Sequence, residues 1–421
     1  MSRDARGVLF ANWTGGYTVP SRGLYPHQWS WDSAFIAIGL RHLSARRAQR
    51  ELESLFGAQW ADGRVPHIVF DPATPLDAYF PGPEFWRSSA VSGAPAVATS
   101  ALIQPPVHAI AAWQVFLADP AEARRRSFLS RLYPRLVAWH RYLTRRRAAP
   151  GADGLVAIVH PWESGMDNSP SWDEPLSRVR PMPADAFRRR DLAHAPAAER
   201  PTDVDYGRYV RLATDYRSAG YADGDFGAFA VLDPLTNALL AAAELSLAEI
   251  ATEVGADPQP HRAAAARVAG ALGSLFEPAD GLFYPRDLHT GRLIRHRTVA
   301  GLVPLILPGL PEAGAVLKTA LGEHFRLGAT PLVPSYDLTG PAFEAARYWR
   351  GPGWFNTTWL IWRGLLAHDE LDHAERLRRS MLETVQRIGF REYVDSVTGA
   401  GCGAADFGWT AALTLDLLAV P

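Results

Sequence analysis

Acidic residues that lie among aromatic residues are the groups in this sequence that could carry out acid–base chemistry. Residues 160–170 (HPWESGMDNSP) hold two of them, Glu163 and Asp167, beside Trp162 and Met166. Apolar neighbours remove water from a carboxyl group, which raises its pKa and keeps it protonated near neutral pH, as a general acid requires. The structural alternative for either acid is to cap a helix or to hold the loop by hydrogen bonds.

A further acidic candidate, Glu392, lies near the C-terminus in residues 389–395 (GFREYVD). A charge in a short extended segment between aromatic residues must be either paired or used in chemistry. Arg391 could be its partner, but adjacent residues on a strand point to opposite faces, which argues against this pair.

Two aromatic-rich segments could supply binding surfaces for a sugar. They are residues 27–32 (HQWSWD) and residues 348–356 (YWRGPGWFN). Their rings and guanidinium group suit stacking on a sugar and hydrogen bonding to its hydroxyl groups. Two acids plus aromatic platforms are the minimum set for glycoside hydrolysis, in which one carboxyl group protonates the leaving oxygen and the other activates water or attacks.

The motifs of several other chemistries are absent from the sequence. A phosphate-binding GxxxxGK[ST] loop is excluded, because Lys318 is the only lysine and Leu317 precedes it. His368 and His373 are five positions apart, so they do not share a helix face as a pair of metal ligands would. We expect no metal and no cofactor. The arginine runs at 124–126, 145–147 and 188–190 are interpreted as solvated surface.

Composition indicates a folded chain with no global charge that would attract a polyanion. Apolar residues make up 48% of the 421 residues, charged residues 21%, and the formal net charge is -1. We therefore expect neither a nucleic-acid nor a membrane partner. The single cysteine, Cys402, cannot form an internal disulfide, and the first residues lack the apolar stretch of a signal peptide, so a cytoplasmic location is expected.

The elements that must position these residues are predicted to be helices. Apolar residues recur at three- and four-residue spacing in several long segments, which predicts roughly ten to twelve helices and an all-α fold. The segments are 34–60, 103–117, 121–147, 234–254, 260–276, 311–325, 355–366, 370–388 and 407–419. The best candidates for small hairpins are residues 282–284 and 389–394.

Long loops rich in Pro, Gly, Trp and Asp separate the predicted helices, and such loops are uncommon unless they build a site. They cover residues 17–32, 60–95, 160–233, 330–354 and 393–406. No linker divides the chain, so a single domain over residues 1–421 is predicted. Residues 160–233 are predicted to be an active-site loop or lid inserted in it.

Four groups of residues, in this order along the chain, resemble the motifs of glycoside hydrolase family sixty-three and its trehalase relatives. They are residues 27–32 (HQWSWD), 162–169 (WESGMDNS), 348–352 (YWRGP), and 392–393 (EY) with 406–410 (DFGWT). The resemblance spans nearly the whole chain. Within that family, the sequence is most similar to the compact bacterial mannosylglycerate and glucosylglycerate hydrolases, which lack the β-domain of the larger processing glucosidases.

The resemblance implies an (α/α)6 toroid whose long loops form the active-site face, and an inverting mechanism with Asp167 as general acid and Glu392 as general base. Sugar contacts are implied for Tyr25, Trp29, Trp31, Asp32, Tyr79, Gln104, Gly165, Tyr348 and Trp349. A clamp on the glycerate carboxylate is implied for Arg200 and Tyr206, with Arg208, Arg211 and Arg217 as competitors. Inversion requires the two catalytic carboxyl groups to lie roughly 6.5–9.5 Å apart, whereas retention requires about 5–5.5 Å.

The expected activity is therefore hydrolysis of α-mannosylglycerate or α-glucosylglycerate. A trehalase or α-glucosidase acting on neutral sugars is the second enzymatic hypothesis. It differs from the first in whether a positively charged side chain faces the site beyond the sugar pocket. A non-catalytic sugar-binding toroid is a third hypothesis, disfavoured because both acids are present. The preferred sugar and the oligomeric state are left open by the sequence.

Overall fold

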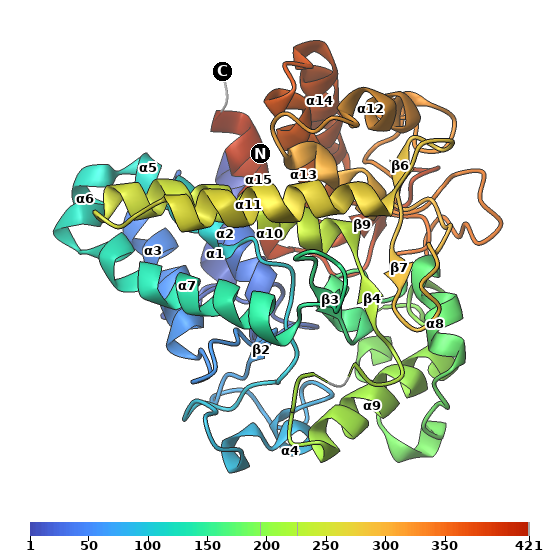
Figure 1. Cartoon of the computed structure of the whole chain (residues 1–421), viewed down its shortest axis with the longest axis horizontal. Helices are drawn as coiled ribbons and strands as arrows, with labels where there is room; N and C mark the ends of the chain where they lie inside the picture. The colour runs from blue at the N-terminus through green and yellow to red at the C-terminus, as the bar shows by residue number, and fades with distance from the viewer. Residues whose placement is uncertain (194, 225, 420–421) are drawn as a thin grey trace.

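Helices are the main regular structure of the chain (Figure 1). The computed structural model describes residues 1–193, 195–224 and 226–419. In this part of the chain, fifteen α-helices are joined by long connections that contain only short 3-10 helices and two-residue strands. The prediction of a mainly helical fold is confirmed.

Six elements that are apolar on most sides lie in the interior. A helix without a polar face must be covered on every side by other parts of the protein. The most completely buried of them, α2, has all eleven residues buried. The six are α2 (Ser30–Leu40), α5 (His108–Ala118), α10 (Pro234–Glu253), the 3-10 helix η9 (Val303–Ile306), α13 (Phe355–Ala367) and α15 (Gly408–Ala419).

These interior elements contact one another in a closed circuit. Helix α2 packs against α5, α5 against α10, and α10 against η9. The circuit continues from η9 to α13 and from α13 to α15, and α15 packs back onto α2. The last helix of the chain therefore closes the circuit that the second helix begins.

Outer helices cover this circuit. Helix α3 packs on α2, α7 on α5 and α10, α11 on α10, α14 on α13, and α1 on α15, and Figure 1 shows α11 crossing in front of α10. Their bounds are α1 (Ser2–Ala11), α3 (Ala45–Gly57), α7 (Phe128–Arg146), α11 (Gln259–Leu272) and α14 (Leu371–Ile388). In α3, the buried residues recur at helical spacing while arginine and glutamate occupy much of the opposite face, as in a helix that covers a core on one side.

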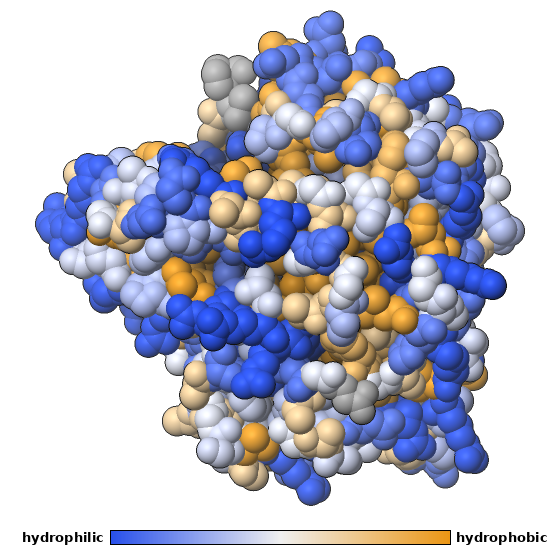
Figure 2. All heavy atoms as spheres, in the orientation of Figure 1, coloured by the Kyte–Doolittle hydropathy of each residue, from blue (hydrophilic) through white to orange (hydrophobic). Residues whose placement is uncertain are grey.

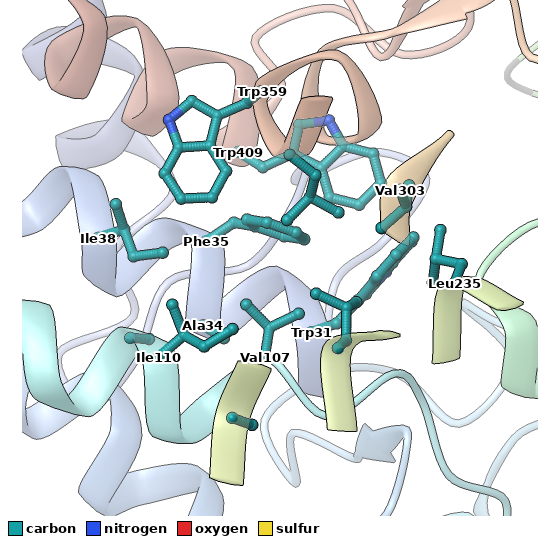
Figure 3. Close-up of a cluster of buried hydrophobic side chains, with 14 of the residues drawn as sticks. Trp31, Ala34, Phe35, Ile38, Val107, Ile110, Leu235, Val303, Trp359 and Trp409 are labelled. Carbon is teal, nitrogen blue, oxygen red and sulfur yellow. The ribbon is translucent and has the colours of Figure 1, made fainter. Parts of the chain in front are cut away.

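A single cluster of buried apolar side chains joins the six interior elements. Figure 3 shows Trp31 and Phe35 of α2 next to side chains from the other five. The others that it labels include Ile110 of α5, Leu235 of α10, Val303 of η9, Trp359 of α13 and Trp409 of α15. Large aromatic rings fill the centre, which accounts for part of the high tryptophan content.

The closest approach within the circuit is between α2 and α15. A Cβ atom at Gly39 of α2 would overlap the backbone of Ala412 in α15. Glycine is thus required here for contact between two backbones rather than for an unusual dihedral angle.

The strands are two residues long and fasten loops together. β1 (Gln28–Trp29) pairs with β2 (Ile68–Val69), and β5 (Phe276–Glu277) pairs with β6 (Leu282–Phe283). Two further sheets have the orders β10-β9-β8 and β3-β4-β7, with every pairing antiparallel. Their bounds are β3 (Ala157–Ile158), β4 (Val231–Leu232), β7 (Arg286–Asp287), β8 (Gly353–Trp354), β9 (Tyr393–Val394) and β10 (Gly401–Cys402). Both predicted hairpin positions therefore contain a paired strand.

Three predicted helices have different bounds. The 34–60 prediction is divided into α2 and α3, because the Ser44 side chain accepts a hydrogen bond from the Arg47 N–H and starts a new helix. The 121–147 prediction is divided into α6 (Pro120–Arg125) and α7. Helix α5 begins only at His108, after the two prolines of the 103–117 prediction, since a proline disfavours helical geometry in the residue before it. Helices α12 and α13 match their predictions more closely: α12 (Ala313–Leu321) lies inside 311–325, and α13 begins at Phe355 as predicted and ends one residue later, at Ala367.

The prediction that residues 160–233 are an unstructured loop is wrong in part. This segment contains α8 (Asp173–Ser177) and α9 (Asp203–Ser218). The start of α9 is indicated in the sequence by a threonine followed by acidic residues. In the structure, the Thr202 side chain accepts a hydrogen bond from the Asp205 N–H, and the acidic residues occupy the first turn. A short helix, α4 (Pro83–Trp86), likewise lies in the loop predicted over 60–95. Apolar residues of α8 and α9 form a second, smaller core cluster with β3 and β4.

Helix α10 is long and apolar enough, by length and composition alone, to cross a membrane. Most of its apolar window is buried inside the protein, as in the core helix of a folded domain. Figure 2 shows hydrophilic residues spread over the visible face, with hydrophobic residues mostly between them in the middle of the view.

Candidate active site

One pocket is lined by every residue to which the sequence analysis assigned a role in catalysis or substrate binding. Its walls come from the N-terminal ends of α2, α9 and α15 and from the segments around residues 79, 104, 165, 191, 200, 348–354 and 392. Asp167 and Glu392 both line this pocket although 225 positions separate them in the sequence. The structure thus brings together all the predicted site residues.

The N-terminal end of α2 carries Trp29, Trp31 and Asp32 into the pocket. The residue before the helix, Trp29, has no side chain that can cap it, and the Gln104 side chain replaces that cap by accepting a hydrogen bond from the Trp31 N–H at 3.1 Å. Trp29 is itself held in β1 by pairing with Ile68 of β2. Burial raises the pKa of Asp32 well above its ordinary value.

Asp167 lies on a tight loop that the tryptophans of the site hold in place. Gly165, with φ of +70°, approaches the Trp31 ring so closely that a Cβ atom would overlap it. The Trp172 indole N–H donates to the Met166 carbonyl at 2.7 Å, and the Tyr209 hydroxyl donates to the Asp167 carbonyl at 2.5 Å. These contacts fix the backbone on both sides of the carboxyl group.

The electrostatic surroundings of Asp167 favour its protonated form. Burial raises the pKa of Asp167 from 3.8 to about 7, against the opposing effect of the Arg200 charge. Among the described residues, Asp167 forms no ion pair within 4.0 Å. A carboxyl group in this state can donate a proton near neutral pH.

Glu392 is fully buried and held by hydrogen bonds at both oxygens. Oε1 accepts a hydrogen bond from the Tyr25 hydroxyl at 2.7 Å, and Oε2 accepts one from the Ala404 N–H at 2.9 Å. The Arg200 Nη1 atom lies 3.7 Å from Oε1. Burial raises the pKa of Glu392, while Arg200 and the two hydrogen bonds lower it, and the pKa stays above its ordinary value. As expected, Arg391 does not pair with Glu392, and its guanidinium group donates to the Gly401 and Gly403 carbonyls instead.

Arg200 enters the pocket as a buried guanidinium group. Its Cζ atom lies over the Tyr348 ring, 4.3 Å from the ring centroid, and Nη2 donates to the Tyr25 hydroxyl at 3.2 Å. Nε donates to Asp191 at 3.3 Å. Nη1 is buried and has no hydrogen-bond partner among the residues that the structure describes. This unpaired N–H group is a ready donor for an acceptor atom of a ligand.

The remaining candidate arginines lie elsewhere. Arg208 contacts Asp205, and Arg211 contacts Asp215 and the Arg180 carbonyl. Arg217 donates to the Phe85 carbonyl. Arg200 is the only arginine among the described residues that line the pocket.

Tyrosines and tryptophans complete the pocket walls. The Tyr79 ring packs edge-on against Trp29 with a centroid distance of 5.1 Å, and the Tyr206 hydroxyl donates to the Phe80 carbonyl at 2.8 Å. Trp349 stacks on Trp354 with a centroid distance of 3.9 Å. Tyr348 adopts φ of +41°, which is an unfavourable backbone conformation for an aromatic residue and is found most often where a site requires it.

Glu163, the other acid of the 160–170 segment, lies behind the pocket wall. It forms a two-point ion pair with Arg147, at 2.7 and 2.8 Å, and also accepts a hydrogen bond from the Val159 N–H at 2.8 Å. Its exposed fraction is 0%. The structural interpretation of an acid that holds its loop by hydrogen bonds therefore applies to Glu163. The interpretation of residues 145–147 as solvated is wrong for Arg147, whose charge is used in this pair.

Asp191, an acidic residue that lines the pocket, was not predicted from the sequence. It follows the arginine run at 188–190, which was interpreted as solvated surface. That interpretation is wrong for Arg189, whose side chain is 7% exposed and donates to Asp191. An acid directly after an arginine run was the available signal, but nothing in the local sequence shows which side of the segment faces inward. His67, Trp354, Phe407 and Trp409 also line the pocket.

The arrangement can perform acid–base chemistry on a polyhydroxylated ligand. It combines a carboxyl group protonated near neutral pH, a second buried carboxylate, aromatic walls and one unpaired guanidinium donor.

Comparison with known proteins decides the family. Residues 25–410 match the family model described as "Mannosylglycerate hydrolase MGH1-like glycoside hydrolase domain". The chain belongs to this glycoside hydrolase family. Its members are glycosidases, and this chain is one of them. The matched region contains both candidate catalytic acids and every predicted contact residue.

Several characterised hydrolases are similar to the chain over nearly its whole length. The chain is 41% identical to a mannosylglycerate hydrolase of Rubrobacter radiotolerans, with 99% of this chain and 96% of the relative covered. It is 35% identical to a glucosylglycerate hydrolase of Mycolicibacterium hassiacum, with 99% and 97% covered. The crystal structure of the family sixty-three mannosylglycerate hydrolase from Thermus thermophilus in complex with Tris and D-glycerate superposes with a TM-score of 0.90 at 40% identity, covering 98% of each chain.

Proposed function

We propose that this glycosidase hydrolyses α-mannosylglycerate or α-glucosylglycerate to the free sugar and glycerate, with inversion at the anomeric carbon. The observation that carries the proposal is that Asp167, Glu392 and the Arg200 guanidinium group line one aromatic-walled pocket. Relatives that are similar over their whole length act on these two substrates by name.

Asp167 is the proposed general acid. It protonates the glycosidic oxygen as the bond to the sugar breaks, and its raised pKa supports this role because the group must carry a proton at the working pH. The loss of the proton leaves Asp167 as a carboxylate.

Glu392 is the proposed general base. It takes a proton from a water molecule that attacks the anomeric carbon from the face opposite to the leaving group, through an oxocarbenium-like transition state. The hydrogen bonds from Tyr25 and Ala404 hold the carboxylate in one orientation. Tyr25 was predicted to contact the sugar, and its bond to Glu392 supports a role in orienting the base as well.

Arg200 is the proposed contact for the glycerate carboxylate. A buried guanidinium group with an unpaired N–H is costly until an acceptor reaches it, and a carboxylate is a strong acceptor for it. This observation favours a glycosylglycerate over trehalose or another neutral α-glucoside, which has no negative group to offer.

We also propose a finer description of the architecture. The closed circuit of six interior elements, each with an outer helix or loop beside it, supports an (α/α)6 toroid formed as one domain over residues 1–421. Residues 160–233 are then the active-site insertion, because they supply Asp167, Asp191, Arg200 and Tyr206 to the pocket.

A product assay tests the proposed activity. Purified protein is incubated with α-mannosylglycerate, α-glucosylglycerate and trehalose, and NMR follows the anomer that forms first. We expect turnover of at least one glycosylglycerate with release of the β-anomer of the sugar. Release of the α-anomer would exclude inversion, and turnover of trehalose alone would exclude the proposed substrate class.

Variants of the two acids test their roles. Asp167→Asn and Glu392→Gln should each lower kcat by about 100-fold or more, because each removes a proton-transfer group. Glu174→Gln, which changes an exposed acid of α8 in the same segment, is the matched control and should keep the wild-type kcat. Near-wild-type turnover by either pocket variant would contradict its assignment.

A further inference from the structure

Asp191 has no role in the chemistry described so far, although it lies in the wall of the pocket. It begins the 3-10 helix η5 (Asp191–Ala193) and is 8% exposed. Its carboxylate accepts hydrogen bonds from two arginines: Arg189 on one side, at 2.5 and 3.1 Å, and Arg200 on the other, at 3.3 Å. Burial raises the pKa of Asp191, but the bond from Arg189 and the charge of Arg200 outweigh this effect, so the pKa is below its ordinary value and the group stays charged.

The two arginines that share Asp191 face different surroundings. Arg189 also contacts Asp203, an exposed residue at the start of α9, and lies over the Tyr206 ring. Arg200 faces the pocket, where its Nη1 atom has no hydrogen-bond partner in the described part of the chain. Asp191 therefore connects an outer arginine to an inner one.

Two carboxylates compete for the guanidinium group of Arg200. Asp191 accepts from Nε, and Glu392 lies 3.7 Å from Nη1, which is beyond a good hydrogen bond. A guanidinium group is planar, so the bonds at Nε and Nη2, together with the contact with the Tyr348 ring, fix the direction of Nη1. Without Asp191, the attraction of Glu392 would draw the guanidinium group into a full ion pair with the proposed base.

We propose that Asp191 is a positioning residue that holds Arg200 away from Glu392, with Nη1 available to the carboxylate of the substrate. This inference rests on the proposed function, because it requires a substrate with a negative group. It assigns the preference for a glycosylglycerate to a pair, Asp191 and Arg200, rather than to Arg200 alone. The negative charge of Asp191 also acts on the acid: burial is the main cause of the raised pKa of Asp167, and Asp191 adds to it.

The experiment compares two substrates in wild-type protein and Asp191→Asn. The substrates are glucosylglycerate and glucosylglycerol, in which a hydroxymethyl group replaces the carboxylate. We expect Asp191→Asn to lower the ratio of kcat/KM for glucosylglycerate to kcat/KM for glucosylglycerol about tenfold, the effect of losing one charge-assisted hydrogen bond. Any change in kcat through Glu392 affects both substrates equally and cancels in this ratio.

The pH profile gives a second readout that a merely structural residue would not change. The charged groups that act on Asp167 are Arg200, Glu392 and Asp191, and those that act on Glu392 include Arg200 and Glu199. Loss of the Asp191 charge lowers the pKa of Asp167, and a closer Arg200 lowers the pKa of Glu392. Both limbs of the kcat profile should therefore move to lower pH with either substrate.

Asp203→Asn is the matched control. It removes the other acidic partner of Arg189, on the exposed side, and should leave the substrate ratio and the pH limbs unchanged. Asp191→Glu keeps the charge but displaces it by one methylene, so it should lower the ratio and leave the pH limbs in place. This variant also decides the question if Asp191→Asn does not fold.

The outcomes separate this inference from the proposed function. A wild-type protein that does not prefer glucosylglycerate over glucosylglycerol would overturn both. A wild-type preference that survives in Asp191→Asn, or in Asp191→Glu where only that variant folds, would overturn the role of Asp191 alone. An equal loss of preference in Asp203→Asn would also overturn it.

Discussion

At the residue scale, the two candidate acids are built differently. Asp167 is held through its backbone, and burial keeps its carboxyl group protonated near neutral pH. Glu392 has donors at both oxygens, which stabilise a carboxylate in one orientation. Burial raises the pKa of both groups, but the Arg200 charge and the two hydrogen bonds oppose this effect at Glu392 and favour its charged form. The difference in environment, rather than residue type, assigns proton donor and proton acceptor.

The raised pKa of Asp167 has a cost in stability that can be measured. The pKa of Asp167 is about 7 in the folded protein and 3.8 when water surrounds the group. As the pH rises from about 4 to 7, the unfolded chain loses this proton while the folded protein keeps it, which destabilises the fold. Asp167→Asn removes this charge, so the variant should melt about 2 °C or more above the wild type at pH 8. At pH 4.5 the difference in Tm should be much smaller, because the folded protein keeps the Asp167 proton and the unfolded chain has only begun to lose it. Thermal unfolding at both pH values checks this, and an equal difference in Tm at both would contradict the raised pKa.

At the element scale, tight contacts between loops and helix ends set the position of the acid. The N-terminal end of α2 is capped by Gln104, a residue from the loop before α5. The loop of Asp167 touches the Trp31 ring of the same helix end through Gly165. Three segments distant in sequence therefore fix one another at the pocket.

Gly165→Ala tests this contact. An added methyl group should push the Asp167 loop away from Trp31, and kcat/KM should fall about tenfold or more because the acid is misplaced. Gly151→Ala is the matched control: its φ of +71° is nearly the same, but no described atom lies within 4 Å of the added Cβ. Both variants should lose about 1 kcal/mol of stability from the left-handed backbone, and only Gly165→Ala should lose activity. A similar loss of activity in both would show that the contact with Trp31 is unimportant.

At the scale of the whole molecule, closure of the helical circuit brings the two halves of the pocket together. The buried Asp416 of α15 pairs with Arg41 after α2 at 2.7 Å and accepts from the Trp359 indole N–H of α13 at 2.9 Å. Near the same closure, Gly39 allows the backbones of α2 and α15 to touch. Glu392 precedes α15 in the chain, so its place beside Asp167 depends on this closure.

Gly39→Ala should weaken the closure. The extra methyl group overlaps the backbone of Ala412, and such overpacking costs roughly 1–3 kcal/mol in the free energy of unfolding. The control is Gly270→Ala, in the exposed face of α11, where no described atom lies within 4 Å of the new Cβ. Alanine there should instead stabilise by roughly 0.5–1 kcal/mol, because it favours the helix. Denaturant unfolding of both variants measures the two opposite changes, and a stabilised Gly39→Ala would contradict the close packing.

The spacing of residues along the chain was enough to predict most of the helices, the family and the residues of the site. Apolar periodicity identified most long helices, and the order of motifs around residues 27–32, 162–169, 348–352 and 392–410 identified the family and the residues that meet in the pocket. These features depend on neighbours within a few positions, which a sequence displays directly. Helix ends that depend on single caps, such as Ser44 and Thr202, were displaced or missed because several nearby residues could have served.

Only the tertiary structure decided what each polar group faces. Glu163 and Asp167 are four positions apart and similar in local sequence, yet Arg147 neutralises Glu163 behind the wall while Asp167 opens into the pocket. Arg189 was interpreted as solvated surface and Asp191 was not predicted at all, yet both are buried around the pocket arginine. The physical reason is that burial and ion pairing arise between residues far apart in the chain, so the charge state and partner of a side chain are set by the fold around it.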